Sequence, residues 1–184
     1  MEKEKIDVLD ENGKETGKVV FKSDAHKQGI WHRGVHIWIY NSKGEVLLQK
    51  RAKMKKFYPD LWDMSAAGHV SAGQSFDEAV ERELFEELGV KAEISEMKKF
   101  GVRKMAQDLE MPFLRNREFV QTYLLKLDKE ISDFKLQEEE VAEVKFVTLD
   151  DFESEIKSPA NYKTYVPHKE YFLHMIELIR EELR

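Results

Sequence analysis

Length, composition and charge exclude several classes of protein. The chain has 184 residues, of which 41% are hydrophobic and 11% aromatic, enough for one domain with a full core and too few for two large domains. It contains no cysteine, which excludes disulfides, zinc–thiolate sites and thiol nucleophiles. The formal net charge of −6, from 36 acidic and 30 basic residues, disfavours a broad surface for a nucleic acid polymer.

The distribution of apolar and charged residues adds two expectations. No run of 18 apolar residues occurs and the chain begins without an apolar signal segment, so we expect a cytoplasmic protein with no membrane partner. Residues 50–56 are strongly basic, whereas residues 77–87 and 138–143 are acidic. A cationic and an anionic patch in one small domain would suit an anionic substrate that carries a metal ion.

The first predicted elements are two pairs of strands. Residues 5–9 and 18–22 are predicted to form a hairpin around an Asn-Gly turn at residues 12–13. Residues 33–40 alternate Val, Ile and Ile with other side chains, and a polar turn leads into residues 45–49. This pattern predicts two further antiparallel strands.

The next segment, residues 75–88, carries a complete helix signature. Ser75 is a candidate N-cap with Glu78 three positions on, and Gly89 follows the last helical position. The expected buried stripe consists of Val80, Leu84 and Leu88.

The second half of the chain is predicted to mix strands and helices. Strands are expected at about 91–103, 118–127 and 142–147, and helices near 149–157 and 168–183, the last a packing helix with one apolar face. These elements predict an α/β or α+β sandwich around one mixed sheet. No repeat, low-complexity tract or linker marks a domain boundary.

Three acidic residues of the predicted helix, Glu83, Glu86 and Glu87, share one face at about 100° per residue, immediately beside the buried stripe. Like charges three and four positions apart repel each other, and more strongly when they are partly buried. The cluster therefore needs a cation, and Mg²⁺ or Mn²⁺ prefers such oxygen ligands. The alternative is a solvated acidic face answered by Arg82 and nearby lysines.

The residues around this helix read G-x5-Q-x7-R-E-L-F-E-E-L-G-V, from Gly68 through Gln74 to Val90. This resembles the Nudix box, G-x5-E-x7-R-E-U-x-E-E-x-G-U with U an aliphatic residue, at every specified position except one. The resemblance implies a Nudix hydrolase with an α/β/α sandwich that binds Mg²⁺ and cleaves a nucleoside diphosphate linked to another moiety. It implies that Glu83, Glu86 and Glu87 are metal ligands and that Arg82 orients a carboxylate.

The exception is Gln74, where the family has glutamate. An amide supplies no negative charge and cannot act as a base. Because this position is more supporting than ligating in the family, we expect weaker metal binding rather than an inactive site.

Other segments resemble type 1 isopentenyl diphosphate isomerase and the Nudix hydrolases related to it. The matching segments are His26, His32, Lys50–Lys56, Tyr58–Trp62 and Gly68–His69. In the isomerase, histidines at positions resembling His26, His32 and His69 join two glutamates at a metal, which implies a possible second metal site. Glu118 matches one glutamate, and Asn116 stands in place of the other.

The isomerase reaction itself is not expected. The resemblance places a proton-donating cysteine at Ala67, and alanine has no proton to give. The diphosphate-binding residues match better, since Arg51 and Lys55 align with residues that hold the diphosphate. An ordinary solvated loop is the alternative for this basic segment. For Tyr58, Trp62 and Trp31, core packing is favoured over an aromatic wall that contacts substrate.

The resemblance thus predicts a metal-dependent Nudix diphosphohydrolase that acts on a nucleoside diphosphate-type or other organic diphosphate. The cofactor would be Mg²⁺ or Mn²⁺. Candidate bases are Glu86, Glu87 and Glu118, with Glu139 and Glu140 as outside candidates. A non-catalytic diphosphate-binding module is the alternative.

We expect a single Nudix hydrolase domain over residues 1–184. It would consist of an N-terminal hairpin (1–25), a core (about 30–157) and a C-terminal helix (about 168–183), and a homodimer is possible because dimers are common in the family.

Overall fold

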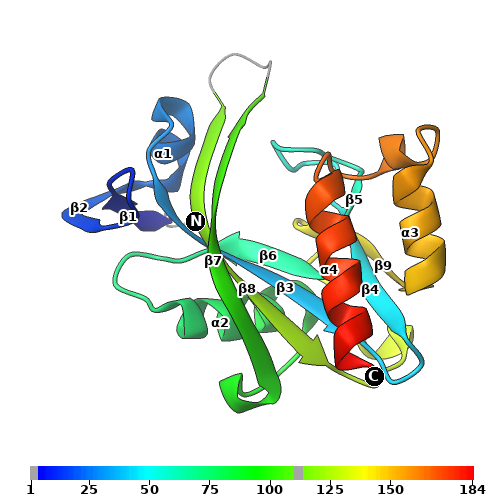
Figure 1. Cartoon of the computed structure of the whole chain (residues 1–184). Helices are drawn as coiled ribbons and strands as arrows, with labels where there is room; N and C mark the ends of the chain where they lie inside the picture. Colours follow the sequence, from blue (N-terminus) through cyan, green and yellow to red (C-terminus); the bar gives the residue numbers. More distant parts are fainter. Residues whose placement is uncertain (1–3, 110–113) are drawn as a thin grey trace.

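The computed structural model describes residues 4–109 and 114–184 (Figure 1). A small N-terminal sheet contains β1 (Lys5–Leu9) and β2 (Glu15–Phe21). The strands of the main sheet are β3 (His32–Tyr40), β4 (Glu45–Arg51), β5 (Trp62–Asp63), β6 (Ala66–His69), β7 (Met97–Asp108), β8 (Arg115–Lys126) and β9 (Val141–Thr148). The α-helices are α1 (Lys22–Gln28), α2 (Phe76–Leu88), α3 (Leu149–Lys157) and α4 (Lys169–Glu182).

The main sheet is mixed and is covered on both faces. Its central order is β5-β4-β3-β8-β7, with β3 and β8 parallel and the other pairs antiparallel. Val35, Ile37 and Ile39 of β3 pack in a core with the apolar stripe of α2. Trp38 and Tyr40 pack in a second core with α3 and α4, because successive side chains of a strand point to opposite faces. The predicted α/β/α sandwich is confirmed.

A gap in strand pairing positions the site. β3 pairs with β4 only at Tyr40 and Val46. Toward its start, β3 pairs instead with β6, from Gly34 opposite His69 to Ile37 opposite Ala66. The two long strands therefore diverge, and β6 lines the opening.

The sequence signature of α2 is realised in full. The Ser75 hydroxyl accepts from the Glu78 backbone N–H, and the Glu78 carboxylate accepts from the Ser75 N–H at 2.7 Å, which together form a capping box. Gly89 ends the helix at φ 66°, a left-handed conformation that favours glycine. The helix consequently begins and ends as predicted.

The N-terminal hairpin is joined to the loop that precedes α2. Ile6 forms an isolated bridge with Ser71. The Asp7 carboxylate accepts from the Gly73 backbone N–H at 2.9 Å and from the Arg33 guanidinium at 2.7 Å. The small sheet thus stabilises the loop that precedes α2.

Two segments differ from the prediction. The hairpin ends at Phe21, and residues 22–28 form α1, which has little apolar patterning because Ala25 is its one buried residue. Strand β7 begins at Met97 rather than residue 91, because a capping box between Glu93 and Glu96 holds a short 3₁₀ turn first. The helices at 149–157 and 168–183 are found within one residue of their predicted bounds.

Candidate functional site

A cavity opens where β3 and β4 diverge, and most of the predicted site residues line it. Those residues are His26, Arg51, Lys55, Gly68, His69, Arg82, Glu83, Glu86, Glu87 and Glu118. Glu140 and Tyr58 also line the cavity, whereas Glu139 does not. Trp31 packs against Phe119, and the Lys145 ammonium lies over Trp62, so neither tryptophan reaches the cavity.

Gly68 is required by the close approach of α2 to β6. A Cβ atom at this position would lie 1.9 Å from Cδ and 2.0 Å from Oε1 of Glu83. Both distances are far below van der Waals contact. The glycine therefore lets the Glu83 carboxylate sit directly against the β6 backbone.

Arg82 holds the acidic face together. Its guanidinium donates to Glu83 Oε1 at 2.8 Å, to Glu86 Oε2 at 3.0 Å and to the His69 carbonyl at 2.8 Å. It also donates to Gln74 Oε1 at 3.4 Å, and that oxygen accepts from the Ser71 N–H as well. Gln74 thus contacts the arginine and the loop rather than a carboxylate.

Glu83 and Glu87 are buried carboxylates, with 8% and 3% of their surface exposed. Burial, and after it the neighbouring Glu83 charge, raise the pKa of Glu87 to about 8. Burial also raises the pKa of Glu83, against the lowering effect of Arg82. Glu86 is more exposed, so the three acids form a gradient from the core to the mouth of the cavity.

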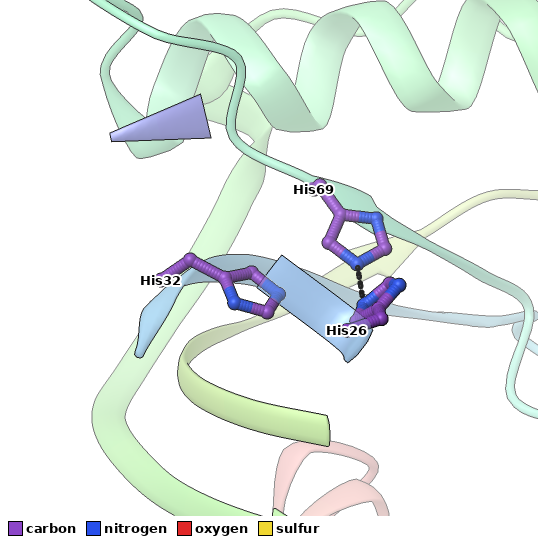
Figure 2. A group of neighbouring side chains, drawn as sticks. All are labelled: His26, His32 and His69. Carbon is purple, nitrogen blue, oxygen red and sulfur yellow. Dashed lines mark hydrogen bonds between the residues drawn. The ribbon is translucent and has the colours of Figure 1, made fainter. Parts of the chain in front are cut away.

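His26, His32 and His69 converge from α1, β3 and β6 (Figure 2), and their ligand nitrogens lie within 4.8 Å of one another. His26 Nε2 and His69 Nε2 are 3.2 Å apart, the dashed contact in the figure. Burial lowers the pKa of His26 to about 4 and that of His69 well below its usual value. Both rings are consequently neutral near pH 7, the form in which histidine binds metals.

The second ring nitrogen of His32 lies close to Glu118. Its Nδ1 donates to the Ile30 carbonyl at 2.8 Å. In the described part of the chain this fully buried Nε2 has no hydrogen-bond partner, and it lies 3.6 Å from Glu118 Oε1.

Glu118 also lies 3.3 Å from His69 Nε2 and accepts from the Asn116 amide. Burial favours a raised pKa for Glu118, but its contacts with His32 and His69 outweigh this effect and the pKa is lowered. Asn116 Oδ1 is buried and, within residues 4–109 and 114–184, has no hydrogen-bond partner. Asn116 is the residue that the sequence resemblance aligns with the second glutamate of the isomerase.

The two basic residues expected to hold diphosphate are each paired with an acid. Arg51 donates to Asp63 Oδ2 at 3.1 Å and to the Phe57 carbonyl at 3.0 Å. Lys55 forms an ion pair with Glu140. Altogether seven carboxylates and four Lys or Arg side chains line the cavity, so it carries an excess of negative charge.

Two cavity histidines, His36 and His168, were not predicted from the sequence. His36 follows His32 by four positions in the same strand, and this even spacing places both side chains on one sheet face. His168 lies just before α4, far away in the chain, and no local pattern points to it.

Among the described helices, none is long and apolar enough to cross a membrane.

Comparison with known proteins identifies relatives along most of the chain. A NUDIX domain family model matches residues 30–169. A Nudix hydrolase of Listeria monocytogenes is 36% identical over 88% of this chain and 89% of its own length. An isopentenyl-diphosphate Delta-isomerase of Pectobacterium atrosepticum is 37% identical over 49% of this chain and 50% of its own.

A solved structure from Deinococcus radiodurans shares the fold. It superposes with a TM-score of 0.67 at 22% sequence identity, covering 98% of this chain and 100% of its own.

Proposed function

Because the chain belongs to the Nudix hydrolase family, enzymes that cleave phosphoric anhydride bonds, we propose that it hydrolyses an organic diphosphate with Mg²⁺ or Mn²⁺. Nucleoside diphosphate derivatives are the first class to test. The observation that carries this proposal is the buried pair Glu83 and Glu87 at the edge of a cavity.

The acidic face fits a divalent cation. Burial raises the pKa of Glu87 to about 8, with the neighbouring Glu83 charge as the second cause, so ionising both carboxylates is unfavourable. A hard cation held by Glu83, Glu86 and Glu87 would remove that cost, since oxygen ligands suit Mg²⁺. When bound, it would lower the pKa of a water molecule and neutralise phosphate charge.

Arg82 is proposed as a positioning residue for the acidic face. It bonds to Glu83 and Glu86 at once, which keeps both carboxylates on the side of the helix that faces the cavity. Gln74 supports Arg82 from the loop. Gly68 leaves the space that Glu83 needs.

Arg51 and Lys55 are proposed to contact the substrate diphosphate. The Arg51 guanidinium is fixed by Asp63 and the Phe57 carbonyl, and its Nη2 has no bond to any described residue. Such a preorganised fork suits a phosphate oxygen. Lys55 would have to leave Glu140 for the substrate, so we expect Arg51 to contribute more.

A second cation site is proposed at His26, His32 and His69, with Glu118 as the neighbouring carboxylate. His32 Nε2 is buried without a hydrogen-bond partner among the described residues and lies 3.6 Å from Glu118 Oε1, so a cation bound there would satisfy both atoms. The unpaired Asn116 Oδ1 is a further, neutral oxygen ligand for a cation. Calorimetric Mn²⁺ titration of His69→Ala tests this site: the number of Mn²⁺ ions bound per chain should fall by one, while binding at the Glu83 site remains.

Hydrolysis is tested with nucleoside diphosphates, triphosphates, nucleotide sugars and dinucleotides, with Mg²⁺ or Mn²⁺ and phosphate release as the readout. Glu86→Gln and Glu87→Gln should each abolish metal-dependent turnover, because an amide supplies neither charge nor base. Glu139→Gln, exposed and outside the cavity, is the matched control. Full turnover in Glu87→Gln would refute the assignment, and a protein that binds diphosphates without turnover would be the non-catalytic module instead.

A further inference from the structure

His36 offers a polar atom to the cavity that the proposed hydrolysis does not use. His36 is only 8% exposed and lines the cavity from β3. It lies four positions after His32 of the histidine cluster in the same strand. Its Nδ1 contacts the Tyr171 hydroxyl at 3.1 Å. Its Nε2 forms no hydrogen bond with the residues that the structure describes, and it is not one of the fully buried atoms that lack a partner.

The surrounding hydrogen bonds determine which nitrogen of His36 carries the proton. The Tyr171 oxygen receives the indole N–H of Trp38 at 3.0 Å, and an indole can only donate. Thr122 Oγ1 lies 3.2 Å from the same oxygen and, in the described chain, has no other partner for its buried hydroxyl. The Thr122 hydroxyl therefore donates to Tyr171 as well.

With both lone pairs of the tyrosine oxygen occupied, its own proton must go to His36 Nδ1. The neutral imidazole then carries its hydrogen on Nε2. Burial lowers the pKa of His36 to about 4, which is consistent with a neutral ring near pH 7. The network thus leaves the Nε2–H of a cavity-lining histidine without a partner among the described residues.

The cavity lining near His36 is partly apolar. Met64, Val166 and Tyr58 line this end of the cavity, together with His168, whose ring nitrogens form no hydrogen bond with the described residues. Asp63 is already engaged by Arg51 and by the Met64 backbone N–H. The acidic face comes from α2, which packs on the opposite face of β3 from Tyr171 and α4.

We propose that this end of the cavity receives the organic moiety of the diphosphate and that His36 Nε2–H donates to an oxygen on that moiety. The site would accordingly select hydroxylated or carbonyl-bearing groups over hydrocarbons. A hydrocarbon moiety leaves the buried N–H unpaired, and sites built to bond a substrate oxygen reject the analogue that lacks it. This inference rests on the proposed function, because it assumes a diphosphate at the acidic face.

The test compares two ligands of equal chain length in which a terminal hydroxyl replaces a terminal methyl group: the methylene-bisphosphonate analogues of 4-hydroxybutyl and pentyl diphosphate, which cannot be hydrolysed. Calorimetry with Mg²⁺ measures their affinities for the full chain. The wild type should prefer the hydroxylated analogue by about 10- to 100-fold. Equal affinities, or no affinity for either analogue, would overturn the inference, while the turnover panel decides the proposed function independently.

Substitutions distinguish the loss of the His36 N–H donor from a general effect on folding. His36→Asn keeps an acceptor for Tyr171 but loses Nε2–H, so the preference should fall to near onefold, whereas His174→Asn on the exposed side of α4 should leave it unchanged. Tyr171→Phe should weaken the preference although Tyr171 does not contact the ligand, because the His36 ring loses the hydrogen bond that keeps its proton on Nε2. Nitrogen-15 NMR of the imidazole should show His36 protonated at Nε2, and a ring protonated at Nδ1 would contradict the derivation.

Discussion

Replacing Gly68 by alanine should displace the Glu83 carboxylate. The added Cβ would lie 1.9 Å from Glu83 Cδ, whereas carbon atoms in contact are about 3.5–4.0 Å apart, so the carboxylate must move by about 2 Å. Metal–ligand distances tolerate deviations of only about 0.2 Å. One ligand is thus lost, and we expect Mg²⁺ or Mn²⁺ affinity to fall at least tenfold.

The stability cost of Gly68→Ala should be smaller than its effect on the metal. The clash is with a side chain that can rotate, so overpacking costs about 1–3 kcal/mol, which lowers the Tm by about 2–12 °C for a chain of this size. Gly101→Ala is the matched control, because no described atom lies within 4 Å of its Cβ position.

Calorimetric Mn²⁺ titration and thermal unfolding of Gly68→Ala, Glu83→Ala and the double variant complete the experiment. The two substitutions should be strongly non-additive in metal affinity, because both remove the same ligand. The reasoning is refuted if Gly68→Ala binds Mn²⁺ as tightly as the wild type, or if the two losses simply multiply.

Three further predictions follow from other parts of the site. Gln74→Glu should tighten Mg²⁺ or Mn²⁺ binding severalfold, because a carboxylate facing Arg82 offsets part of the arginine charge that opposes the cation; an unchanged metal titration would count against this. His36 has a folded pKa of about 4 against about 6.5 when unfolded, so the unfolded chain binds the proton first as pH falls. The free energy of unfolding should therefore decrease between about pH 6.5 and pH 4, by up to about 3 kcal/mol. Denaturant unfolding across this range should show a flatter pH profile for His36→Asn than for the wild type, and parallel profiles would be inconsistent with a buried neutral ring. The purified protein should not interconvert isopentenyl and dimethylallyl diphosphates, since Ala67 at the cavity has no proton to donate; NMR detection of either isomer forming from the other would show the exclusion to be wrong.

The sequence alone predicted the elements whose signals are local. Ser75, Glu78 and Gly89 specify the ends of α2, and the spacing of Val80, Leu84 and Leu88 specifies its buried face, because capping and periodicity act within one or two turns. The same spacing placed Glu83, Glu86 and Glu87 together at the core boundary. Helix α1 escaped prediction because only Ala25 is buried in it.

Tertiary structure decided the partners of the charged and polar side chains. Whether Arg51 meets Asp63, or Lys55 meets Glu140, depends on how β4 packs against β5 and on where the loop before β9 passes. No periodicity encodes these pairings.

The same holds for the two histidine arrangements. His26, His32 and His69 meet because β3 pairs with β6 and α1 folds back over them, and His36 meets Tyr171 from 135 residues away in the chain. Local pattern therefore determined which side chains the chain carries on each face. Only the packing of distant segments decided which of those side chains were left with an unpaired lone pair or an unpaired N–H, and these are the atoms that a cation or a substrate can satisfy.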